Sequence, residues 1–190
     1  MRTNVLAAIL LCSWTAAAQA SRIVPAFSTD GTDCATTALP FTPFNVYVVA
    51  ILADDFAADG IQGAEFRVDG FDPAWITALT RDPASQNAAG DPLGNGVQMG
   101  YATCQQGPVL LYSILVFALA PVPPTTLEVT QANPPSNMNF QCPSVLLCGG
   151  PLFTRICVGG GTAEINPEFC ACCIATQPSS WSRVKSLYTN

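Results

Sequence analysis

Cysteine is the residue type whose number and spacing carry the most chemistry in this sequence. Nine cysteines are present, and Cys12 falls in a segment that we expect to be cleaved. An even set of cysteines in an exported chain predicts a disulfide framework, because disulfides persist in oxidising compartments. The eight that remain are Cys34, Cys104, Cys142, Cys148, Cys157, Cys170, Cys172 and Cys173.

We expect Cys34 and Cys104 to bond to each other, because both lie apart from the six cysteines of segment 142–173. In the chain-entropy model, closing a loop of that length stabilises a fold by about 4 kcal/mol. The other six cysteines are expected to bridge among themselves. Cys172 and Cys173 should take different partners, because neighbouring side chains of an extended segment point to opposite faces.

A zinc site is the alternative chemistry for the C-terminal cysteines. Cys142, Cys148, Cys170 and Cys173 could together supply four thiolates. Structural zinc sites, however, use closely paired cysteines, and these four do not have that spacing. An oxidising compartment also favours disulfides over thiolates. We therefore predict no zinc here.

The chain contains no histidine. This excludes Ser-His-Asp and Cys-His nucleophiles and every histidine-ligated metal site. A pair of carboxylates could still hydrolyse a glycosidic bond. Acidic residues scattered over turns and one strand face are nevertheless ordinary in an acidic exported domain, so we predict that the protein is not an enzyme. The carboxylates that a glycoside hydrolase could use are Asp54, Asp55, Asp59, Glu65, Asp69 and Asp72.

Calcium is the one cofactor that the acidic residues leave open. Asp55, Ala57, Asp59 and Gly60 fall at the first, third, fifth and sixth positions of an EF-hand loop. Ala57 and Phe66, however, stand where that loop requires ligands, which excludes an EF-hand. Asp30 with Asp33, or Asp54, Asp55 and Asp59, could instead hold calcium in a looser loop site, and the alternative is that these aspartates are solvated turn residues.

Aromatic side chains could provide stacking platforms for sugar rings in a secreted domain. The candidates are Trp75, Tyr101, Tyr112 and Trp181. Trp75 and Tyr112 stand among apolar neighbours, so we expect these two rings to be buried in the core. A carbohydrate-binding module is therefore the alternative function, not the first choice.

Residues 1–20 have the organisation of a cleavable signal peptide. Arg2 gives a positive start, Val5–Leu11 is apolar, and Ala18-Gln19-Ala20 is a small-x-small cleavage pattern. The apolar run is far shorter than the about 20 residues that span a bilayer, so we expect no stable membrane insertion after cleavage. The predicted destination is the periplasm or the exterior of a bacterial cell envelope.

The formal net charge of −6 argues against nucleic acid and anionic membranes as partners, because both require clustered basic residues. The hydrophobic fraction of 49% is too high for a disordered chain. We expect one domain over residues 21–176, with a cysteine-rich part at 142–173. Residues 177–190 are expected to form a linker and a tail.

Short apolar or alternating segments separated by turn residues predict an all-β sandwich. The loops are expected at 54–60 and 81–96. Asp72 should begin a helical turn that places Trp75 and Leu79 in the core. The expected strands are Ile23–Phe27, Asn45–Leu52, Ile61–Asp69, Val97–Thr103, Val109–Ala120 (buried on both faces) and Thr125–Thr130, with a tight hairpin at Gly159–Ile165.

The last ten residues have a different pattern. Trp181, Val184, Leu187 and Tyr188 fall at helical spacing, which predicts a short amphipathic element. Ten residues cannot hold a helix alone in water. The tail is therefore expected either to dock on its own domain or to act as a recognition or sorting signal.

Two resemblances add to this interpretation. Gly60–Val68, followed by Phe71-Asp72-Pro73, resembles the strand-then-turn segment of cohesin-type modules, which are β-sandwiches of extracellular bacterial proteins that bind dockerin partners or serve as scaffolds. The whole exported chain also resembles a loose group of uncharacterised secreted bacterial proteins, and the tail resembles an ending found on some of them. That second resemblance rests on Gly31–Cys34, Val46–Val49, Leu93–Val97, Tyr101–Cys104 and Gly160–Thr162.

The sequence thus predicts an immunoglobulin-like or cohesin-like β-sandwich, stapled by disulfides and ending in an amphipathic tail. The predicted function is a secreted, non-enzymatic adhesion, scaffold or interaction module whose partner is a protein or a glycan. The first alternative is a carbohydrate-binding module, and the second is a carboxylate-based glycoside hydrolase.

Overall fold

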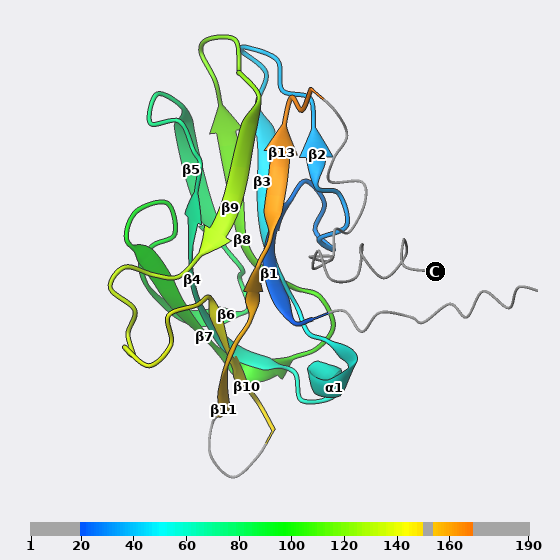
Figure 1. Cartoon of the computed structure of the whole chain (residues 1–190), viewed down its shortest axis with the longest axis vertical. Helices are drawn as coiled ribbons and strands as arrows, with labels where there is room; N and C mark the ends of the chain where they lie inside the picture. Colours follow the sequence, from blue (N-terminus) through cyan, green and yellow to red (C-terminus); the bar gives the residue numbers. More distant parts are fainter. Residues whose placement is uncertain (1–19, 150–153, 169–190) are drawn as a thin grey trace, which may run out of the picture.

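The computed structural model describes residues 20–149 and 154–168, and these residues form two β-sheets packed face to face (Figure 1). The predicted all-β sandwich is confirmed. Residues 1–19 of the predicted signal peptide, Cys170, Cys172, Cys173 and the tail lie outside the described residues. Within the described part, no helix is both long and apolar enough to cross a membrane.

The first sheet has five strands in the order β12-β1-β3-β8-β5. All neighbours are antiparallel except β12 and β1, which are parallel. β8 is a central strand, because β3 pairs with one of its edges and β5 with the other. The strand bounds are β12 Gly159–Gly160, β1 Arg22–Ala26, β3 Phe44–Ile51, β8 Val109–Phe117 and β5 Ile76–Arg81.

The second sheet has eight strands, and β4 is its hub. The first half of β4 pairs with β10 and with β7, and its last three residues pair with β9. A four-residue helix, α1 (Asp54–Ala57), precedes β4. The strand bounds are β11 Thr154–Cys157, β10 Ser144–Leu147, β4 Ile61–Asp69, β9 Thr125–Thr130, β13 Thr162–Ile165, β2 Ala35–Thr36, β7 Gly96–Gln105 and β6 Ser85–Asp91.

The core lies between the sheets and follows the period-2 pattern of the strands. Ala64, Phe66 and Val68 of β4 point inward and are buried, as their alternation predicts. Phe66 meets Tyr112 of the opposite sheet edge to face, with ring centroids 6.2 Å apart. Burying one side chain of this size stabilises the fold by about 1.5–3 kcal/mol, so this inward row fixes which face of β4 is left outside.

Two disulfides are present in the described residues, and the predicted Cys34–Cys104 bond is wrong. Cys104 instead bonds to Cys148, and Cys142 bonds to Cys157. The reason is topological: β7 and β10 both pair with β4, so their ends meet, whereas Cys34 precedes β2 at the far edge of the sheet. Cys148 therefore does not bond within the C-terminal group of six cysteines, contrary to expectation. The alternative zinc site is also excluded, because two of its four cysteines, Cys142 and Cys148, are in disulfides.

Gly60 makes the Cys104–Cys148 crossing possible. Its φ of +70° lies in the left-handed region, which L side chains rarely adopt. A Cβ at this position would lie 2.5 Å from the Cys104 sulfur. The disulfide therefore passes over a residue that can only be glycine without local rearrangement.

Five local expectations are corrected. Segment 81–96 contains strand β6, whose polar residues suit an edge strand that pairs only with β7. The loop at 54–60 includes α1. No hairpin forms at 159–165, because β12 pairs with β1 whereas β13 pairs with β9. Trp75 is buried as expected, but Leu79 lies on edge strand β5 and is exposed. The strand at Val109–Ala120 was expected to be buried on both faces, but no described segment covers the outer face of β8. Leu115 on that face is 44% exposed.

Candidate functional site

The outer face of the eight-stranded sheet presents a polar row along β4. Glu65, Arg67 and Asp69 point outward, alternating with the buried core residues. Arg67 donates to Asp69 at 2.9 Å, and the Thr130 hydroxyl donates to the same carboxylate at 2.6 Å. We call this surface the polar face and define it by Glu65, Arg67, Asp69, Gln98 of β7 and Thr130 of β9.

Glu65 is the exception on this face, because it is only 5% exposed. The loop that follows β9 and the β10–β11 hairpin cover it. Arg155 of β11 donates from Nη2 to Glu65 Oε2 at 2.5 Å, and the backbone N–H of Ser136 donates to Oε1 at 2.7 Å. The Ser136 hydroxyl donates to Oε2 as well. The carboxylate therefore has partners on both oxygens.

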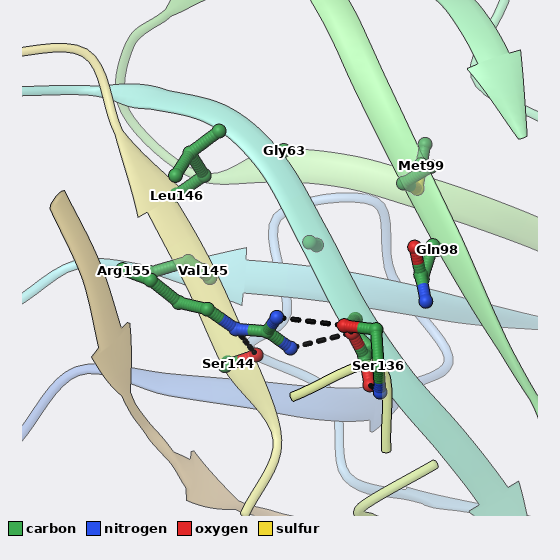
Figure 2. Close-up of a pocket in the computed structure, with 10 residues that line it drawn as sticks. Gly63, Gln98, Met99, Ser136, Ser144, Val145, Leu146 and Arg155 are labelled. Carbon is green, nitrogen blue, oxygen red and sulfur yellow. Dashed lines mark hydrogen bonds and ion pairs between the residues drawn. The ribbon is translucent and has the colours of Figure 1, made fainter. Parts of the chain in front are cut away.

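Arg155 is held in place by three further contacts. Its Nη1 donates to the Ser136 hydroxyl at 2.7 Å, and its Nε donates to the Ser144 hydroxyl at 2.9 Å. The guanidinium carbon lies 5.0 Å from the ring centroid of Phe140, within cation–π range. Figure 2 shows Arg155 reaching over β10 toward Ser136, with its hydrogen bonds to Ser136 and Ser144 as dashed lines. The guanidinium thus joins β11, β10 and the loop to β4.

The charge state of Glu65 follows from this environment. Burial of the carboxyl group raises its pKa, but the hydrogen bonds from Ser136 and Arg155 and the positive charge of Arg155 outweigh burial. The net pKa therefore lies below the ordinary value. Glu65 is ionised at neutral pH and its charge is neutralised internally. Such a group braces a surface, and it is not a free acid or base for catalysis.

A shallow hollow opens beside this ion pair, with a volume of about 150 Å³. Small-molecule sites usually occupy about 300–1,000 Å³, so the hollow suits one inserted side chain better than a whole ligand. Gly63 lies in its wall, opposite Gly100 in the β4–β7 register, and has no side chain to fill the space. The lining residues are Gly63, Ala64, Glu65, Gln98, Met99, Ser136, Ser144, Val145, Leu146 and Arg155.

The carboxylates predicted from the sequence have separate local roles. Asp72 accepts the backbone N–H of Ala74 at 2.8 Å and so caps the turn before Trp75. Asp54 and Asp55 lie in the first turn of α1. In the described ranges, no group of three or more His, Cys, Asp or Glu side chains is placed to hold a metal ion. Calcium binding at Asp54, Asp55 and Asp59 therefore stays a prediction from the sequence alone.

Three of the four candidate sugar-stacking rings are buried. Trp75 and Tyr112 are in the core, as expected, and Tyr101 is buried with them. Trp75 packs edge to face against Phe44 and Phe71. The fourth ring, Trp181, lies outside the described residues together with Val184, Leu187 and Tyr188.

The residues that complete the site were missed in the sequence. Arg155 and Ser136 reach Glu65 from positions 90 and 71 residues away along the chain, and Ser144 accepts a hydrogen bond from Arg155. One signal was available: Arg155 is the only basic residue between Arg81 and Arg183. A lone cation within an apolar strand needs a buried or half-buried partner, and Glu65 supplies it.

Comparisons with known proteins place the fold. No family model matches the chain, and no curated protein matches it. Among solved structures, the seventh ScaB type I cohesin from Pseudobacteroides cellulosolvens is similar, with a TM-score of 0.51, 9% identity, and coverage of 80% of this chain and 95% of that one.

The cohesin OlpA from Clostridium thermocellum, solved as a cohesin–dockerin complex, is also similar. Its TM-score is 0.51 at 10% identity, and the match covers 77% of this chain and 99% of that one. Identities this low show the fold and nothing finer. The chain therefore has a cohesin-like β-sandwich fold.

Proposed function

We propose that this protein is a secreted, non-enzymatic interaction or scaffold module that binds a partner protein through its polar face. The observation that carries the proposal is the hollow braced by the buried Glu65–Arg155 pair. A side chain of the partner would insert into the hollow, and the polar residues around the hollow would form hydrogen bonds with the partner at the rim. Interfaces of this kind combine a small central pocket with a polar periphery.

Rigidity of the polar face supports this role. The Cys142–Cys157 bond ties the two ends of the β10–β11 hairpin, which carries Arg155. The Cys104–Cys148 bond ties the same hairpin to β7. A surface that is already ordered loses less conformational entropy on binding, so more of the contact energy appears as affinity.

The similar solved structures and the disulfides support the kind of partner and the cellular location that we propose. The OlpA cohesin was solved with a dockerin, which is a protein partner, and this favours a protein over a glycan for the present chain. Disulfides persist in oxidising compartments, which supports a periplasmic or extracellular location. Burial of Trp75, Tyr101 and Tyr112 removes three of the four rings that a carbohydrate-binding module could use. Pairing of Glu65 with Arg155 removes one candidate acid from a hydrolase.

A matched pair of surface variants tests the proposal. Gln98→Arg places a long cation at the hollow, whereas Thr80→Arg places the same side chain on exposed strand β5 of the other sheet. Proteins retained by the immobilised exported chain are identified by mass spectrometry, and their affinity is then measured by biolayer interferometry with purified components. We expect Gln98→Arg to weaken binding about tenfold or more, and Thr80→Arg to leave it unchanged.

Two results would contradict the proposal. Equal affinity of the Gln98→Arg and wild-type proteins for the retained partner would remove the polar face from the interface. Retention of glycans on an array, with no protein partner, would favour the carbohydrate-binding alternative.

A further inference from the structure

The outer face of the five-stranded sheet carries an apolar patch where the last part of β8 pairs with the first part of β5, beside the exposed Asn45 of β3. On β8, Leu115 and Phe117 point outward, and the register places Ala78 and Ile76 of β5 beside them. Ile76 is 55% exposed and Leu119, just beyond β8, is 53% exposed. A row of apolar side chains in water on adjacent strands is unusual unless something covers it.

The apolar surface continues onto the end of the sandwich. The backbone N–H of Phe41 donates to the Ala118 carbonyl at 2.9 Å, which places Phe41 next to Leu119. The Phe41 ring is 66% exposed, although its φ of +58° lies in a region that bulky residues rarely adopt. We define the apolar face as Phe41, Ile76, Ala78, Leu115, Phe117 and Leu119.

The last described residues of the chain lie at this same end. The Asn166 side chain accepts the N–H of Ala38 at 2.8 Å and donates to the carbonyls of Ala38 and Val122. Ala38 leads directly to Phe41, and Val122 follows Leu119. In Figure 1 the end of β13, the segment after β2 and the loop after β8 meet at the top of the sandwich.

The chain that continues from this point has the length to reach the apolar face. Thirteen steps separate Glu168 from Trp181. At about 3.3 Å for each residue, they span at most roughly 40 Å, which is enough to cross one face of a domain of this size. A tether of this length gives a tail a local concentration on the order of millimolar at its own domain.

The tail has an apolar side that could cover this surface and basic residues that complement the acidic domain. Trp181, Val184, Leu187 and Tyr188 form one apolar side at helical spacing, and Arg183 and Lys185 fall outside that stripe. The described residues carry all 13 acidic residues of the chain but only four basic ones, so the basic tail is attracted to the domain. We propose that residues 181–190 fold back as a short amphipathic helix on the apolar face of their own domain. This inference is independent of the polar face.

Trp181 reports directly on the docking. The exported chain has two tryptophans, Trp75 in the core and Trp181 in the tail, so the wild-type spectrum minus the Trp181→Phe spectrum isolates Trp181. We expect blue-shifted Trp181 emission with weak quenching by iodide in the wild-type protein. Leu115→Asp should lower the ratio of docked to free tail about tenfold, with red-shifted emission and stronger quenching.

Met138→Asp is the matched control, because Met138 is 68% exposed but lies in the loop over the other sheet. It should leave Trp181 emission unchanged. If Leu115→Asp fails to fold by circular dichroism, Ile76→Ser on edge strand β5 replaces it, with the same expected direction. Dilution should not change the wild-type spectrum, since the contact is intramolecular.

Three results would overturn the inference. Solvent-exposed Trp181 emission in the folded wild-type protein would show that the tail does not dock. Equal effects of Leu115→Asp and Met138→Asp would place the tail elsewhere. Loss of the blue shift on dilution, with a matching change in mass by light scattering, would mean that a second copy covers the apolar face.

Discussion

The two outer faces of this sandwich are built from the same strand alternation but have opposite chemistry. On the eight-stranded sheet, the outward positions of β4 carry Glu65, Arg67 and Asp69, and a loop and a hairpin cover the first of them. On the five-stranded sheet, the outward positions of β8 carry Leu115 and Phe117. The buried charge of the polar face is therefore satisfied by contacts within the described residues. The apolar face, by contrast, has exposed apolar side chains that a further segment could cover.

The difference also separates two ways of stabilising a surface. Glu65 and Arg155 contribute through a specific geometry, so removing Arg155 leaves the buried Glu65 carboxylate without an opposite charge. Leu115 and Ile76 contribute only when a partner excludes water from them. Mutations of the Glu65–Arg155 pair should therefore change the stability of the domain, and mutations on the apolar face should change only how well a covering segment binds there.

The largest effect is expected for Arg155→Ala. This change leaves the buried Glu65 carboxylate without its cationic partner, which should lower the free energy of unfolding by about 3–5 kcal/mol. Urea denaturation followed by circular dichroism measures the loss. Arg67→Ala is the control, because its ion pair with Asp69 is partly exposed and should contribute about 1 kcal/mol or less. Equal losses in the two variants would contradict the bracing role of Arg155.

The next effect is expected for the double variant Cys142→Ala with Cys157→Ala. The bond closes a loop over a sequence separation of 15, so its removal should lower the free energy of unfolding by about 3 kcal/mol in the chain-entropy model. The polar face should lose affinity for its partner as well, because the hairpin that carries Arg155 becomes less ordered. A destabilised protein with unchanged affinity would show that the hairpin does not organise the binding surface.

Acid should act on the polar face through Glu65. A carboxyl group with a lowered pKa in the folded state stabilises the fold above its unfolded pKa and loses that contribution as pH falls through the folded value. Wild-type stability should therefore fall as the pH drops from about 5 toward 3, within the range where carboxyl groups titrate. Glu65→Gln cannot titrate, so its stability deficit relative to the wild type should be larger at pH 7 than at pH 3. A deficit that is constant with pH would contradict the assignment.

The smallest effect on stability is expected for Leu115→Asp on the apolar face. This side chain points outward and is partly exposed, so the free energy of unfolding should change by about 1 kcal/mol or less. Thermal and urea unfolding measure it alongside Arg155→Ala. A loss as large as that of Arg155→Ala would mean that the apolar face is structural, and the contrast between the two faces would fail.

Much of the fold could be predicted from local patterns. The alternation of Ala64, Phe66 and Val68 with charged neighbours identified both the strand and its buried face. Continuous apolar runs identified β3 and β8 as strands of the sheet. Strand β6 was not predicted, because an edge strand made of polar residues shows no alternation of apolar residues.

The candidate site could not be predicted, because its parts come from distant segments. Glu65 reads as one more solvated acid until β11 and the loop after β9 are placed over it. The pairing of Cys104 failed for a related reason: it depends on β7 and β10 meeting at β4, and spacing along the chain does not contain that information. Even Leu115 was expected to be buried, since an apolar run does not reveal which of its faces is covered.

Hydroxyl-radical footprinting of the complex with an identified protein partner is the most direct test of the central claim. Oxidation of side chains is compared between the free and bound protein on both faces at once. We expect protection of Leu146, which lines the hollow, and of Met138, which lies two residues after Ser136 in the loop over Glu65, with oxidation of Ile76 and Leu115 unchanged. Protection of Ile76 and Leu115, with Met138 and Leu146 unchanged, would contradict the central claim and assign partner binding to the apolar face.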